Sequence, residues 1–217
     1  MSDFSTARQK MVDGQVRPSD VTDLRIIDAM LAVPREEFVP ASQRAMAYLD
    51  LDLEVAPNRF LIKPVVLARM LQASDVKATD KVLVVGCPTG YSAAVIAQFA
   101  GKVTATEGDA ALAAKASEDM ARLGYSNITL AAGMPADGHA ANAPYDLIVL
   151  AGATEVLPTG LYKQLAPGGQ LVGVFALTKP ARAMIVTHSH DDFGSRPLFD
   201  ATAPVLPGLE KLPEFVF

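Results

Sequence analysis

Apolar and polar positions follow different periods in the two parts of the chain. In the first part, apolar residues recur at helical spacing in short stretches, as at Leu24, Ile27 and Leu31. This spacing gathers apolar side chains on one face of a helix. We predict helical segments over 3–14, 23–31, 35–39, 42–48 and 64–72, with 58–63 as a connecting segment. The pattern predicts an N-terminal helical addition over 1–75, packed on a core over 76–217.

From Lys81 onward, short apolar runs alternate with stretches of helical spacing. Runs without polar residues are typical of strands buried on both faces of a parallel sheet. We predict strands over 82–85, 103–107, 127–132, 145–151 and 170–176, and helices over 92–100, 110–123 and 157–165. Two later runs, 183–188 and 193–199, favour an antiparallel pair joined by a turn at 189–192. The sequence therefore predicts an α/β fold, a mostly parallel sheet with helices on both faces and an antiparallel C-terminal edge.

The tight turn between the first of these strands and its helix consists of Gly86, Cys87, Pro88, Thr89 and Gly90. Glycines let the backbone approach a ligand, and a helix N-terminus offers free N–H groups to an anion. Strand, glycine turn and helix together indicate the start of a nucleotide-binding βαβ unit. Cys87 lies just before the helix, where the pKa of a thiol can fall. The alternative is a small residue that lines the pocket.

Glu107 ends the next predicted strand, 21 positions after Gly86. A carboxylate at that spacing can accept hydrogen bonds from ribose hydroxyls. The alternative is a surface acid at a strand end. A sheet of this type binds its ligand at the carboxyl ends of the strands. We therefore expect Gly86, Glu107, the turn at Gly133 and the stretch 151–154 to lie near one another.

Composition narrows the class of protein. The 217 residues are half hydrophobic and one fifth charged, with 19 basic and 24 acidic side chains and a net charge of −5. An acidic balance argues against a non-specific nucleic-acid partner. The single cysteine rules out an internal disulfide, and no apolar run approaches the length of a membrane span. The three histidines lack metal-ligand spacing. We expect a cytoplasmic protein with no metal site and no nucleic-acid or membrane partner.

Several N-terminal motifs are specific to one family. They are Met11-Val12, Asp28-Ala29-Met30, Val33-Pro34-Arg35-Glu36-Glu37-Phe38-Val39-Pro40 and Ala47-Tyr48-Leu49-Asp50. Further motifs follow in the family's order: the glycine turn with Tyr91, then Gly124, Ala143-Pro144-Tyr145-Asp146, Pro158, Gln164-Leu165 and Gly168-Gly169. From about Met11 to Phe175 the chain resembles protein-L-isoaspartate O-methyltransferases. The resemblance implies a Rossmann-like class I methyltransferase fold and the cofactor S-adenosylmethionine. It also implies methyl transfer to the carboxylate of L-isoaspartyl residues in damaged peptides or proteins.

The resemblance further implies roles for particular residues. Glu107 would hold the ribose, the 86–90 turn would cradle the methionine part, and Gly133 and Met134 would lie beside the adenine. The family's substrate segment corresponds to 58–64, so we expect a substrate cleft at Phe60, Leu61, Ile62 and Lys63. The alternative for the three apolar residues is packing under the N-terminal helices. Arg59 and Lys63 would attract an anionic substrate, or be solvated surface charges. No residue is predicted to be catalytic, since such an enzyme mainly supplies positioning.

Five positions differ from the family's pattern. Phe60 replaces a threonine, Ile62 a serine, Val84 an acid, Pro88 the middle glycine of the turn, and Met134 an aspartate. Isoleucine cannot donate a hydrogen bond, and proline has no backbone N–H. An alternative is therefore a divergent methyltransferase-fold protein with a changed acceptor, or with a non-catalytic binding or regulatory role. A nicotinamide-dependent oxidoreductase would also contain a βαβ unit. However, the turn is not GxGxxG, and the N-terminal motifs have no counterpart in such enzymes.

Overall fold

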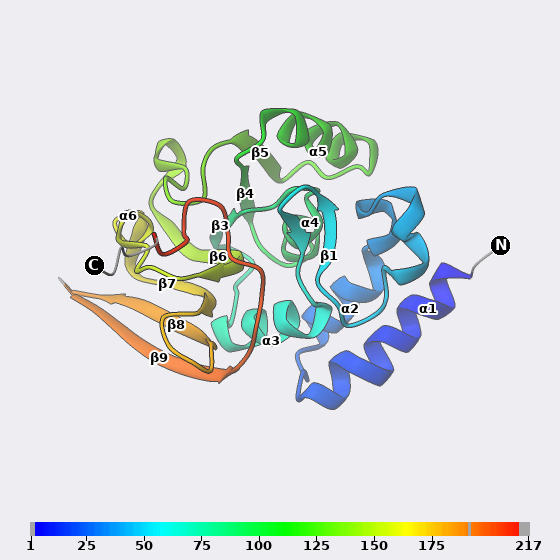
Figure 1. Ribbon diagram of the computed structural model, residues 1–217, viewed down its shortest axis with the longest axis horizontal. Helices are drawn as coiled ribbons and strands as arrows, with labels where there is room; N and C mark the ends of the chain where they lie inside the picture. Colours follow the sequence, from blue (N-terminus) through cyan, green and yellow to red (C-terminus); the bar gives the residue numbers. More distant parts are fainter. Residues whose placement is uncertain (1–2, 191, 213–217) are drawn as a thin grey trace, which may run out of the picture.

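A seven-stranded sheet forms the centre of the computed structural model, which describes residues 3–190 and 192–212 (Figure 1). The strands are β3 (Lys81–Val85), β4 (Lys102–Glu107), β5 (Ile128–Ala132), β6 (Tyr145–Thr154), β7 (Leu165–Phe175), β8 (Arg182–Ser189) and β9 (Asp192–Asp200). Their order is β5-β4-β3-β6-β7-β8-β9. The first five in this order run parallel, and β8 and β9 are antiparallel. The predicted sheet and its antiparallel C-terminal edge are confirmed; position 191 of the predicted turn lies outside the described residues.

Helices and one small hairpin complete the fold. They are α1 (Phe4–Met11), η1 (Val12–Val16), η2 (Arg17–Ser19), α2 (Leu24–Ala32), η3 (Arg35–Phe38), η4 (Ala41–Met46), β1 (Leu53–Ala56), β2 (Arg59–Leu61), α3 (Pro64–Ser74), α4 (Tyr91–Ile96), α5 (Ala110–Arg122), η5 (Ala140–Asn142) and α6 (Thr159–Tyr162). None of the helices in the described part of the chain has both the length and the apolar character needed to span a membrane.

Two local predictions were wrong. The segment 58–63 is not a plain connection, because β2 pairs antiparallel with β1 across a short turn in which Asn58 takes a φ of 55°. Asparagine tolerates this left-handed conformation, which allows so tight a reversal. The stretch 167–169 does not precede β7 but lies inside it. The pairing of β6 with β7 shifts register there, so the two glycines and the proline form an irregularity within the strand.

The central strands of the sheet are buried on both faces. Val82 and Val84 of β3 belong to the cluster formed with the N-terminal helices, α3 and α4. Leu83 and Val85 point the other way, into a second cluster that includes Leu161 of α6. Successive strand residues face opposite sides. The run of apolar residues in β3 therefore serves two packing layers, which confirms helices on both faces of the sheet.

Arg35 lies completely buried where the N-terminal elements meet the core. Its Nε donates to the carbonyl oxygen of Ala47 at 2.8 Å, and an Nη donates to that of Ile62 at 2.9 Å. The guanidinium carbon lies 4.5 Å from the ring centroid of Tyr91, the first residue of α4. Burial lowers the pKa of the Arg35 guanidinium, with the tyrosines nearby acting in the opposite direction. One buried cation thus joins η3, the β1–β2 hairpin and α4.

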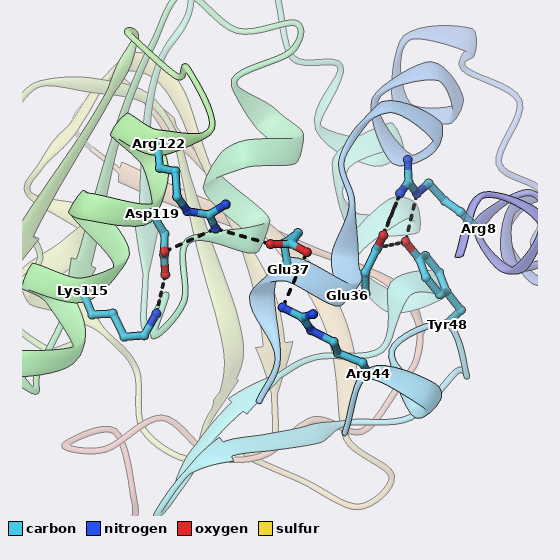
Figure 2. A network of polar contacts seen from close by, with 8 residues as sticks. All are labelled: Arg8, Glu36, Glu37, Arg44, Tyr48, Lys115, Asp119 and Arg122. Atoms are coloured by element: carbon cyan, nitrogen blue, oxygen red, sulfur yellow. Dashed lines mark hydrogen bonds and ion pairs between the residues drawn. The ribbon is translucent and has the colours of Figure 1, made fainter. Parts of the chain in front are cut away.

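Two further polar clusters hold the N-terminal elements, as Figure 2 shows. In the first, Arg8 donates to Glu36 at 3.1 Å and to the hydroxyl of Tyr48 at 2.9 Å, and that hydroxyl donates to Glu36. Burial, followed by the bond to Glu36, raises the pKa of Tyr48. In the second, Glu37 accepts from Arg122 of α5 at 3.4 Å. The first cluster ties α1 to η3, and the second ties η3 to the core.

We predict that Arg35→Ala lowers the free energy of unfolding by about 3–5 kcal/mol, because it opens a cavity and leaves two buried carbonyl groups without their donor. Urea denaturation followed by circular dichroism measures this. The control is Arg17→Ala, which removes an exposed ion pair with Asp13 and is expected to change stability by less than about 1 kcal/mol. Equal, small effects of the two substitutions would contradict the structural role of Arg35.

Candidate functional site

The glycine turn and Glu107 meet at one edge of the sheet because β3 and β4 are parallel neighbours. The backbone N–H groups of Gly86 and Cys87 both donate to the carbonyl oxygen of Thr106, at 3.1 and 2.9 Å. Gly86 and Gly90 have φ values of 73° and 85°, which side-chain-bearing residues rarely adopt. The turn is thus pinned directly beside the end of β4.

Glu107 is buried, with 1% of its side chain exposed. Its Oε1 accepts from Nε of Arg59 at 2.6 Å and from the backbone N–H of Asp109 at 2.9 Å. Its Oε2 is also buried and has no hydrogen-bond partner among residues 3–190 and 192–212. Buried polar atoms nearly always have a partner. Glu107 therefore presents one acceptor that is available to a ligand.

A small cavity lies between the turn, Glu107 and the β1–β2 hairpin. Of the predicted site residues, Phe60, Gly86, Pro88 and Glu107 line it. Residues 204–207 of the C-terminal segment close its other side. The cavity measures about 10 Å³. Such a volume admits roughly one water molecule.

The remaining predicted residues lie around this cavity. Gly133 donates its backbone N–H to the carbonyl oxygen of Glu107 at 2.9 Å. Met134 is partly exposed, and its Sδ lies 3.2 Å from the position that a Cβ on Gly108 would take. Thr89 lines a second cavity of about 230 Å³, on the α5 side of the turn. The structure thus brings Gly133 and Met134 to the same sheet edge as Glu107.

The predicted substrate segment is divided between the cavity and the core. Leu61 and Ile62 are buried within the cluster under the N-terminal helices. Lys63 forms an ion pair with Asp52 at 3.2 Å. Its Nζ also donates to the carbonyl oxygen of Thr202, at 3.3 Å. Only Phe60 of these predicted cleft residues lines the cavity beside Glu107.

Cys87 does not have the lowered pKa that its place before a helix suggested. Burial raises the pKa of its thiol to about 11, and the backbone N–H groups of Ala93 and Gly90 only partly oppose this. The desolvation of the thiolate outweighs the helix N-terminus here because the side chain is completely enclosed. Cys87 is therefore an inert side chain of the turn rather than a nucleophile.

Two parts of the site were absent from the sequence prediction. The first is the pairing of Arg59 with Glu107, since the sequence only indicated that Arg59 could attract an anion. The second is the C-terminal segment 204–207. Neither has a local signal, because each depends on residues far apart in the chain meeting at the sheet edge. The prolines at 204 and 207 were the only hint of an extended segment.

Comparison with known proteins places the chain among methyltransferases of one kind. The family model described as protein-L-isoaspartate(D-aspartate) O-methyltransferase matches residues 6–192. A protein-L-isoaspartate O-methyltransferase of Koribacter versatilis is 40% identical over 172 residues, covering 79% of this chain and 78% of its own. Protein-L-isoaspartate O-methyltransferase 1 of Rhodopseudomonas palustris is 37% identical over 182 residues, covering 84% and 74%.

Solved structures show the same fold. One protein-L-isoaspartate O-methyltransferase superposes with a TM-score of 0.83 at 23% identity, covering 94% of this chain and 67% of its own. A Plasmodium falciparum structure, described as a beta-aspartate methyltransferase in complex with S-adenosyl-L-homocysteine, superposes with a TM-score of 0.79. It is 18% identical and covers 92% of this chain and 97% of its own. These likenesses confirm the Rossmann-like class I methyltransferase fold.

We predict that the Cys87 thiol resists an aromatic disulfide reagent in the folded protein at about pH 8, where an unfolded thiol with a pKa near 8.5 reacts readily. Because its folded-state pKa is the higher one, its contribution to stability is complete below about pH 8.5 and is lost as the pH rises towards 11. Absorbance of the released thiolate, in buffer and in urea, measures the difference. Rapid reaction of the native protein would contradict the burial of Cys87.

Proposed function

Because the chain belongs to the protein-L-isoaspartate(D-aspartate) O-methyltransferase family, we propose that it methylates the carboxylate of L-isoaspartyl residues in peptides or damaged proteins, using S-adenosylmethionine. The observation that carries the proposal is the family match over residues 6–192. A non-catalytic role gains no support from this membership, and neither does a nicotinamide-dependent oxidoreductase.

The residues at the sheet edge have chemical properties that suit the cofactor. Oε2 of Glu107 is buried and unpartnered among the described residues, as suits an acceptor for a ribose hydroxyl. The positive φ values of Gly86 and Gly90 let the turn approach a ligand without a Cβ in the way. We propose that Glu107 and the 86–90 turn hold the cofactor, with Gly133 and Met134 beside its adenine.

The reaction requires little acid–base catalysis from the protein. S-adenosylmethionine supplies a methyl group on a positively charged sulfur. The acceptor is a carboxylate, which with an ordinary pKa near 4 is already ionised at neutral pH and needs no base to activate it. Ile62 therefore removes a hydrogen-bond donor from the family's pattern but no reacting group. The chain has to position the two partners and exclude water.

We further propose that the segment 60–63 borders the substrate cleft, with Phe60 at the surface of the cleft and Leu61 and Ile62 packed beneath it. Phe60 borders the cavity beside Glu107, and Lys63 donates to Thr202, which lies just before the residues 204–207 that close the cavity. We also keep the division into an N-terminal addition over 1–75 and a core over 76–217, which the contact between Glu37 and Arg122 joins (Figure 2). A cytoplasmic location is our proposal from the composition, and so is the absence of a nucleic-acid partner from the acidic net charge.

We predict that the purified protein transfers labelled methyl groups from S-adenosylmethionine to a peptide with one L-isoaspartyl residue, and not to the same peptide with aspartate. The aspartyl peptide is the matched control, because only the attachment of one carboxylate differs. Scintillation counting of the recovered peptide measures transfer. Equal labelling of the two peptides, or no labelling of several isoaspartyl peptides at saturating cofactor, would contradict the proposed function.

A further inference from the structure

The C-terminal segment 201–209, which we call the strap, returns from β9 across the carboxyl ends of the central strands (Figure 1, red). Val205 pairs with Ala153 of β6 in a parallel bridge. Ala153 donates its N–H to the carbonyl oxygen of Pro204 at 2.7 Å, and its own carbonyl oxygen accepts from Leu206 at 2.9 Å. The strap therefore has a defined register at the end of β6.

Leu206 occupies the space that the glycine turn leaves for a ligand. A Cβ added to Gly86 would overlap Cδ2 of Leu206, and one added to Gly152 would lie 2.7 Å from the same atom. The side chain is buried and belongs to the same apolar cluster as Leu83, Val85 and Leu150. It thus lies directly on the first glycine of the turn, where close backbone approach suits a cofactor.

Two basic side chains close the site from the hairpin side. Arg59 covers Oε1 of Glu107, the carboxylate proposed to hold the ribose. Lys63 donates to both the carbonyl and the hydroxyl oxygen of Thr202, at 3.3 and 3.2 Å, and so links the hairpin to the strap. What remains is the cavity of about 10 Å³. A molecule with an adenosine and a methionine part does not fit where about one water molecule does.

We propose that the strap is an autoinhibitory element that competes with S-adenosylmethionine, with Leu206 as its plug. This inference rests on the proposed function. The cofactor binds only to the fraction of molecules in which Leu206 has left Gly86, so its apparent dissociation constant is the intrinsic one divided by that fraction. Backbone hydrogen bonds to Ala153 and Glu155, the Lys63 contacts with Thr202 and the buried side chains of Leu206 and Leu209 hold the strap, and these are the interactions that opening breaks. A partner or substrate that draws the strap away would then raise cofactor affinity.

The test is the affinity for S-adenosylhomocysteine, measured by isothermal titration calorimetry. Leu206→Ala shortens the plug and leaves the backbone bonds of the strap in place. It is expected to tighten binding by about tenfold, because the competing apolar contact is weakened. The matched control is Leu212→Ala, the same substitution at a leucine that is 83% exposed. The Leu212→Ala variant is expected to bind S-adenosylhomocysteine with the affinity of the wild-type protein.

Amide hydrogen exchange on the wild-type protein gives a second readout that no substitution can confound. Saturating S-adenosylhomocysteine is expected to speed exchange at the N–H of Leu206, which now bonds to Ala153, although ligands usually protect nearby amides. Unchanged or weaker binding by Leu206→Ala, or protection of that amide, would overturn the strap proposal while leaving methyl transfer intact. If no variant binds S-adenosylhomocysteine at millimolar concentration, the strap proposal and the cofactor assignment are both wrong.

Discussion

The burial of one charged group, the Arg35 guanidinium, determines how the N-terminal elements lie on the sheet. A buried cation is costly unless hydrogen bonds compensate for its lost hydration, and Arg35 donates from Nε and one Nη to two main-chain carbonyls. The carbonyl of Ile62 belongs to the segment that follows β2. By fixing this segment, Arg35 also fixes the hairpin that carries Arg59 to Glu107. The geometry of the site is thus set from a residue that does not line its cavity.

The differences from the family's pattern acquire physical meaning in this setting. Val84 is fully buried in the cluster that faces the N-terminal helices, so an acid at position 84 would need a partner that the apolar surroundings do not offer. Pro88 removes one backbone donor from the turn but leaves both positive-φ glycines. Arg59 meets the carboxylate of Glu107 from the hairpin. The scaffold is that of the family, while Val84 and Pro88 depart from its pattern at the glycine turn.

The sequence was sufficient to predict the structure where the relevant residues are close together in the chain. The apolar run before Gly86 and the spacing to Glu107 predicted two neighbouring parallel strands and the edge at which they end. It was insufficient where two distant segments meet. Leu206 reaches Gly86 from the far end of the chain, and nothing in the residues around either position encodes that contact. Cys87 shows the same limit, because its pKa depends on enclosure by the whole fold rather than on the helix that follows it.

The most direct test of the account is a crystal structure of the full chain grown with S-adenosylhomocysteine. We expect ligand density at the 86–90 turn, with a ribose hydroxyl on Glu107 and the Leu206 side chain displaced from Gly86. Density for the ligand at another place, with Leu206 still seated on Gly86, would contradict it. That result would mean that the strap is a permanent part of the sheet edge and that this chain holds its cofactor elsewhere.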